Sequence, residues 1–150
     1  MATAERRAEV TWNGDLMSGN GQLTLASSGV LTNTPVTWAS RTENPDGRTS
    51  PEELLAAAHA ACYAMAFSAA LARGGTPPQQ LYVTAVAAFD RKEGGGFQVT
   101  TMDLTVRGRV PGLDQRSFEQ AAQTAEQGCP ISNALRNNVQ IRVHATLEGA

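Results

Sequence analysis

The first forty residues show the alternation of apolar and polar positions that is typical of β-strands. Val10 and Trp12 alternate with polar neighbours, and Leu23 and Leu25 fall on one face of a second short stretch. Residues 18–21 between them, Ser-Gly-Asn-Gly, are turn formers because glycine and asparagine accept a positive φ. A third apolar stretch, residues 29–38, is interrupted by a proline, and a loop rich in turn formers is expected over residues 41–48.

The pattern then changes to that of a long helix. Ser50-Pro51-Glu52-Glu53 combines a capping hydroxyl, a proline at the first helical position and an acidic first turn. The apolar run continues to Gly74-Gly75, so the predicted helix spans about 23 residues or about 35 Å. Few polar residues interrupt it on any side, and we therefore expect it to be buried nearly all round. A membrane span is the alternative, but the many alanines make the segment too weakly hydrophobic.

The second half of the chain predicts strands and helices in separate blocks. Strands are expected over residues 81–89 and 97–110, joined by a glycine-rich turn. A helix follows from its cap at Asp114 to residue 127, and a short helical turn from 131 to 136. The last segment, residues 139–148, alternates without interruption, which predicts a half-solvated antiparallel strand. Because strands and helices do not alternate regularly, we predict one α+β domain over residues 1–150.

Composition and charge exclude several classes of protein. The chain is 41% hydrophobic and 17% charged with a formal charge of −2, so no basic excess suggests nucleic acid. No apolar segment follows the charged N-terminus, which argues against secretion and predicts a cytoplasmic protein that does not act on membranes. In a reducing compartment, two cysteines are buried bystanders, metal ligands or redox groups. Only two histidines are present, neither at ligand spacing, so no metal or other cofactor is expected.

The two cysteines differ in their local surroundings. Cys129 directly precedes a helix-starting proline, where backbone N–H groups could point at its sulfur and favour the thiolate. The alternative is a small apolar residue at a tight junction. Cys62 lies mid-helix among alanines, where burial should raise its pKa and leave it inert unless a cation approaches it. The best candidate for that cation is Arg41, oriented by Glu52. His59, one turn before Cys62, is expected to be a buried histidine with a hydrogen-bond partner.

These motifs resemble those of a known family. Residues 49–63, Thr-Ser-Pro-Glu-Glu-Leu-Leu-Ala-Ala-Ala-His-Ala-Ala-Cys-Tyr, look like the central helix of the OsmC/Ohr family, the osmotically inducible protein C and organic hydroperoxide resistance proteins. Residues 128–135, Gly-Cys-Pro-Ile-Ser-Asn-Ala-Leu, resemble its second cysteine motif. Shorter similarities occur at residues 12–14, at 28–31 followed by Arg41, and at 110–114. The Ala-Ala-His-Ala-Ala-Cys form is closer to the OsmC branch.

The resemblance implies a fold, an assembly and a chemistry. The fold would be OsmC-like, with antiparallel sheets around a long buried central helix in an intertwined homodimer. Cys62 would be the peroxidatic thiolate that reduces organic hydroperoxides, and Cys129 the resolving cysteine that forms a disulfide with it. Arg41 matches the arginine that lowers the pKa of the peroxidatic thiol, and Glu52 the glutamate that holds it. A dithiol, in this family commonly a dihydrolipoyl group, would reopen the disulfide.

Helix geometry adds one expectation about the assembly. Glu52 and Cys62 are ten residues apart, which is about 15 Å along a straight helix. We therefore expect Arg41 and Glu52 to reach Cys62 from the partner subunit, or through a bent first turn. Two other functions stay open, namely a non-catalytic redox sensor or small-ligand-binding protein on the same fold, and a structural protein with inert thiols.

Overall fold

The computed structural model describes residues 1–149. It divides into two compact units, residues 1–54 and residues 55–150. A single domain over residues 1–150 stays a prediction, and its last residue lies outside the described part of the chain.

The first unit is a small antiparallel sheet followed by a short helix. Its strands are β1 (Glu9–Asn13), β2 (Asn20–Thr24) and β3 (Thr34–Val36), paired in the order β1-β2-β3. Gly21 of β2 is required by packing, because a Cβ there would lie 2.8 Å from both the Trp12 ring and the Val36 side chain. The absence of a side chain at Gly21 therefore lets the indole of Trp12 lie against the sheet.

Helix α1 (Trp38–Thr42) corrects the expected start of the loop. Thr37 accepts a hydrogen bond from the Ser40 backbone N–H, and the Ser40 hydroxyl accepts one from the Thr37 N–H. This is a capping box in which serine replaces the usual glutamate or glutamine, so the sequence pattern did not reveal it. Arg41 consequently lies on a helical turn and not in a loop.

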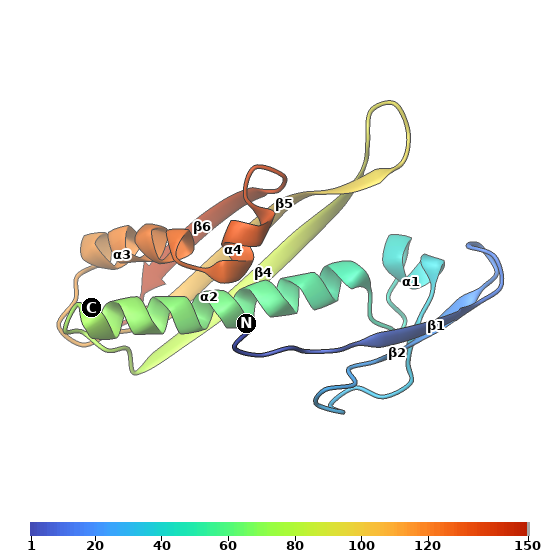
Figure 1. The fold of residues 1–150 in the computed structure, drawn as a ribbon. Helices are drawn as coiled ribbons and strands as arrows, with labels where there is room; N and C mark the ends of the chain where they lie inside the picture. The colour runs from blue at the N-terminus through green and yellow to red at the C-terminus, as the bar shows by residue number, and fades with distance from the viewer. Residues whose placement is uncertain (150) are drawn as a thin grey trace. The chain divides into compact units, whose positions relative to one another are not determined.

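The second unit contains most of helix α2, a three-stranded sheet and two further helices. Their bounds are α2 (Pro51–Arg73), β4 (Gln80–Arg91), β5 (Phe97–Arg109), α3 (Gln115–Gln127), α4 (Pro130–Leu135) and β6 (Gln140–Leu147). Within this unit, Figure 1 shows α2, α3 and α4 on one side of the sheet. The turn of the β4–β5 hairpin projects past β6, which pairs only with residues 101–108 of β5.

The sheet of the second unit has the order β4-β5-β6, and its last strand runs parallel to β5. The prediction of an antiparallel last strand, and of antiparallel sheets throughout, is therefore wrong. Alternation of apolar and polar residues reports only that one face is buried, and it carries no information about direction. The direction follows from the connection, because α3 and α4 form a crossover that returns the chain to the starting end of β5.

Helix α2 buries a single face within the chain. His59, Tyr63, Phe67 and Leu71, each four residues after the last, are buried in the core of the second unit. Phe67 packs against Phe118 of α3 at a ring-centroid distance of 5.1 Å. The expectation of burial nearly all round is wrong for the single chain, since most alanines on the other faces are half-buried or exposed. Among the described residues α2 alone is long and apolar enough to cross a membrane, a test that core helices also pass.

Candidate active site

The two cysteines of the chain meet between α2 and the start of α4. Cys62 lies on α2 and Cys129 is the N-cap residue of α4, and their sulfur atoms are 3.3 Å apart. Both are free thiols, with Cys129 fully buried and Cys62 partly accessible. A disulfide bond is about 2.05 Å long. A small approach of the two segments would therefore suffice to join the sulfurs.

The Cys62 thiol has opposing influences on its ionisation. Burial raises its pKa, and the neighbouring Cys129 thiol acts in the same direction. The backbone N–H of Ile131, in the first turn of α4, donates a hydrogen bond to the Cys62 sulfur and lowers the pKa. The net direction is upward, so the second unit by itself keeps Cys62 a thiol. This agrees with the expectation that burial raises the pKa of Cys62.

The backbone hydrogen bond that was predicted for the Cys129 sulfur is made to the Cys62 sulfur instead. Cys129 does occupy the capping position, and Pro130 does open the helix, but no backbone N–H of that turn bonds to the Cys129 side chain. The Ile131 N–H instead points to Cys62 across the gap between the two helices. The expectation that backbone N–H groups of this turn point at the Cys129 sulfur is therefore wrong.

Arg41 and Glu52 form a two-pronged ion pair within the first unit. Arg41 Nη2 donates to Glu52 Oε1 at 2.7 Å, and Arg41 Nε lies 3.0 and 3.1 Å from the two carboxylate oxygens. The carboxylate is buried, while about a third of the Arg41 side chain is accessible. The guanidinium also lies over the Trp38 ring, 5.8 Å from its centroid. Glu52 thus holds Arg41 in one orientation, as the sequence predicted.

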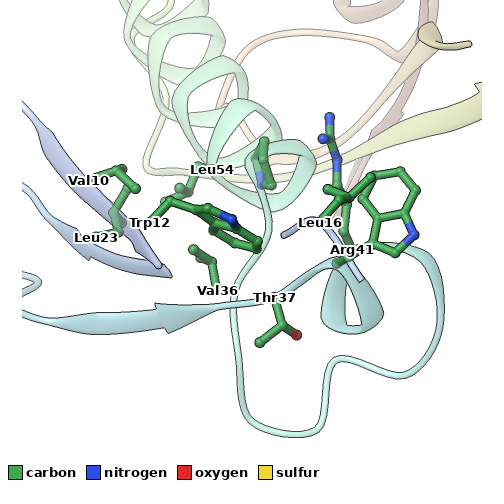
Figure 2. Close-up of a pocket in the computed structure, with 10 residues that line it drawn as sticks. Val10, Trp12, Leu16, Leu23, Val36, Thr37, Arg41 and Leu54 are labelled. Carbon is green, nitrogen blue, oxygen red and sulfur yellow. The ribbon is translucent and has the colours of Figure 1, made fainter. Parts of the chain in front are cut away.

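An apolar pocket of about 470 Å³ lies beside this ion pair in the first unit. Figure 2 shows its lining, in which side chains from β1, β2 and β3 face the pocket and Arg41 rises from α1. Nearly all of the lining is hydrophobic, from Val10, Trp12, Leu16, Leu23, Val36 and Leu54 among others. The arrangement can accept an apolar group next to a fixed positive charge.

Two polar contacts flank the cysteines, one buried and one partly buried, and the second was missed by sequence reasoning. His59 Nε2 lies 2.7 Å from the Ser132 hydroxyl, and both side chains are fully buried, which confirms the expected buried histidine. The missed contact is the ion pair of Glu126 and Arg136, with 2.9 Å between Oε1 and Nη1. No sequence pattern signals it, because its partners lie on either side of a turn whose shape only the fold determines.

The donor set around the cysteines does not suggest a metal. Among residues 1–149, no three histidine, cysteine or acidic side chains gather closely enough to hold one. A partly accessible thiol in near contact with a buried one, with polar side chains beside them, is typical of a cysteine-based redox protein.

Comparison with known proteins defines the family within that class. The family model described as OsmC-like protein matches residues 44–144. The chain belongs to the OsmC family. It is 36% identical over 139 residues to the peroxiredoxin OsmC of Escherichia coli K12, covering 93% of this chain and 95% of that protein. Homology of this extent to a peroxiredoxin supports hydroperoxide peroxidase activity in this chain.

Members of the Ohr branch are more distant. The organic hydroperoxide resistance protein of Xanthomonas axonopodis is 33% identical over 98 residues, which cover 62% of this chain and 63% of that protein. The crystal structure of the organic hydroperoxide resistance protein OhrB of Bacillus subtilis matches 93% of this chain and 98% of its own, with a TM-score of 0.74 and 25% identity. These matches confirm the α+β OsmC-like fold with its long central helix.

Proposed function

We propose that this chain is a thiol peroxidase that reduces organic hydroperoxides to alcohols through Cys62 and Cys129. The observation that carries the proposal is the 3.3 Å separation of the two free sulfurs. Homology to the peroxiredoxin OsmC supports the same activity. The names of the Ohr relatives support an organic hydroperoxide as the substrate.

The proposed cycle has three steps. The Cys62 thiolate attacks the terminal oxygen of the hydroperoxide, the O–O bond breaks, and the departing alkoxide takes a proton to become the alcohol. Cys62 is then a sulfenic acid. The Cys129 sulfur attacks it, the S–O bond breaks, and the hydroxide leaves with the Cys129 proton as water. A dithiol, such as a dihydrolipoyl group, reduces the resulting disulfide by two thiol exchanges and becomes oxidised itself.

Arg41 is the proposed cation for the first step, with Glu52 as the residue that positions it. A guanidinium close to a thiolate stabilises the charged form and would reverse the upward shift that burial gives Cys62. The same group can polarise the O–O bond of the bound peroxide. The two-pronged contact with Glu52 supports this role, since a fixed donor loses little freedom when the substrate arrives.

The apolar pocket beside Arg41 is the proposed site for the organic part of the substrate. Burial of an alkyl or aromatic group against its hydrophobic lining would favour binding, and hydrogen peroxide has no such group. The positive charge at its edge would hold the peroxide end. This pairing of an apolar surface and a cation supports a preference for organic hydroperoxides.

A redox sensor with the same two cysteines is the second candidate function. A sensor would consume about one hydroperoxide per chain and stop, whereas a peroxidase turns over while a dithiol is supplied. Both functions need a reactive thiolate, so the ion pair of Arg41 and Glu52 fits either one, and turnover with an excess of dithiol decides between them.

The first test is a stoichiometric oxidation. One equivalent of cumene hydroperoxide should remove two hydrogens from the reduced chain, and peptide mapping should place the new bond between Cys62 and Cys129. Intact-mass spectrometry before and after the dose measures the change. A chain that keeps both thiols, or that gains oxygen only at methionine, would contradict the proposed chemistry.

We also propose that the chain acts as an intertwined homodimer. Along α2, Ala58, Ala61, Met65 and Ala69 form an exposed apolar stripe opposite the buried face, and Met65 is 69% exposed. Such a stripe is costly to leave in water and fits close helix packing. A dimer would also allow Arg41 and Glu52 of one chain to serve Cys62 of the other.

Met65→Glu tests the dimer, because a charge on this stripe costs little in a lone chain but is buried without a partner in an interface. The wild type should sediment at twice the chain mass, and Met65→Glu should sediment as a single chain. Val86→Glu on β4 is the matched control, since Val86 is similarly exposed at 57% but lies outside the stripe. Dissociation by both variants, or by neither, would count against this interface.

A further inference from the structure

A buried hydrogen bond joins α2 to α4 beside the cysteine pair. His59 Nε2 and Ser132 Oγ are 2.7 Å apart, and neither side chain is accessible to solvent. Both partners lie in the second unit. His59 is on α2, as is Cys62, and Ser132 is on α4, whose N-cap residue is Cys129. This bond is therefore part of what sets the distance between the two sulfurs.

The positions of the two partners match the positions of the two cysteines. His59 precedes Cys62 by three residues, and Ser132 follows Cys129 by three residues. On a helix, residues three apart lie on the same side, about one turn from each other. The hydrogen bond and the sulfur pair thus form two adjacent links between α2 and α4, one turn apart on each side.

A second contact fixes Cys129 from its other side. Glu126, three residues before Cys129, forms an ion pair with Arg136 at 2.9 Å, and Arg136 also donates to the Glu126 carbonyl oxygen at 3.3 Å. These contacts close the turn that carries Cys129 and Pro130. Two hydrogen bonds attach this turn to α2, one between His59 and Ser132 and one from the Ile131 N–H to the Cys62 sulfur.

The histidine has properties that simple filling of space does not explain. Burial lowers the pKa of His59 against the opposing charge of Glu126, so the imidazole is neutral near pH 7. Its Nδ1 atom has no hydrogen-bond partner among the described residues, which costs free energy that an apolar side chain would avoid. Among residues 1–149, the hydrogen bond that compensates is the one to Ser132.

We infer that His59 and Ser132 are positioning residues for the resolving step, holding Cys129 against Cys62 so that the sulfenic acid is captured before a second peroxide reaches it. The inference rests on the proposed peroxidase cycle. In the step concerned, an S–S bond forms, the S–O bond breaks and water leaves, with no other reactant. A second hydroperoxide would instead add an oxygen and give the sulfinic acid, which the dithiol does not reduce.

Ser132→Ala tests the inference by removing the hydroxyl and almost nothing else. The reduced protein is treated with excess cumene hydroperoxide and no dithiol, and the masses of disulfide and sulfinic acid are compared. Formation of the sulfenic acid, followed by stopped flow, should change less than about twofold. The disulfide should form about tenfold more slowly, and the sulfinic acid should rise from a trace to a major product.

A conservative variant and a matched control separate positioning from stability. His59→Gln keeps a polar nitrogen at the place of Nε2 and should form the disulfide nearly as well as the wild type. His59→Leu should form more sulfinic acid. Tyr63→Phe removes another buried hydrogen bond of α2, the 2.9 Å bond from the Tyr63 hydroxyl to the Ala122 carbonyl on α3. It should lower the melting temperature and leave the ratio of products at the wild-type value.

The outcomes also separate this inference from the proposed function. A wild-type Cys62 that is not oxidised at all would overturn the peroxidase cycle. Oxidation with an unchanged product ratio in Ser132→Ala would overturn the positioning role and leave the cycle standing. An equal rise of sulfinic acid in Ser132→Ala and Tyr63→Phe would also overturn it, because general loosening would then be the cause.

Discussion

Cys62→Ser is expected to lower steady-state reduction of cumene hydroperoxide by at least about 10³-fold, to the background rate. Serine keeps the size of the side chain, but its hydroxyl does not ionise near neutral pH and cannot accept the oxygen of the peroxide. The measurement is consumption of hydroperoxide with a dihydrolipoyl dithiol in excess. Unchanged turnover in this variant would remove Cys62 from the mechanism.

Cys129→Ser is the matched variant, because it removes the other sulfur and leaves the first one in place. It should form one sulfenic acid per chain at close to the wild-type rate, and a trapping reagent such as dimedone should label Cys62. No intramolecular disulfide can follow. If instead Cys129→Ser loses the first oxidation and Cys62→Ser keeps it, the order of the two cysteines is reversed.

Arg41→Ala is expected to lower the rate of Cys62 oxidation at pH 7 by about 100-fold, since a nearby cation typically shifts a pKa by 1 to 3 units and each unit is a factor of ten in thiolate. The measurement is the pre-steady-state rate with cumene hydroperoxide. Arg48→Ala is the control, because Arg48 belongs to the same unit and its ion pair among the described residues is with the exposed Asp46. Equal losses in the two variants would show a general charge effect.

The role of Arg41 also predicts how the rate of Cys62 oxidation depends on pH. The thiolate is the reactive form, so the rate follows the fraction of Cys62 that has lost its proton. Burial raises the pKa of Cys62, and in Arg41→Ala the hydrogen bond from the Ile131 N–H offsets that rise only in part. The rate of that variant should climb about tenfold per pH unit through the neutral range, while the wild-type rate is already on its plateau. A wild-type profile that climbs in parallel would contradict the role of Arg41.

The sequence predicted those parts of the fold whose signals are local. Ser50 and Pro51 start α2, and Gly74 follows its end, as expected. Asp114 caps α3 through the Ser117 N–H. The direction of β6 and the extent of burial of α2 were predicted wrongly, because neither follows from the local pattern of apolar and polar residues.

The candidate site was predictable to a similar extent. The resemblance to the OsmC/Ohr family identified both cysteines, and the structure brings their sulfurs together. The ion pair of Arg41 and Glu52 was expected and is present, whereas its place beside Cys62 stays a prediction. The link between His59 and Ser132 could not be foreseen, since a buried histidine acquires its partner only when α4 packs on α2.

The length of chain between the two sulfurs has a thermodynamic consequence. Cys62 and Cys129 are separated by 67 positions, so their bond would cyclise nearly half of the polypeptide. Chain-entropy arguments assign about 4 kcal/mol of added resistance to unfolding to a ring of that size. In each catalytic cycle the protein would then alternate between a less stable dithiol form and a more stable disulfide form. When the dithiol reductant is exhausted, the protein would accumulate in the disulfide form, which is the form most resistant to unfolding.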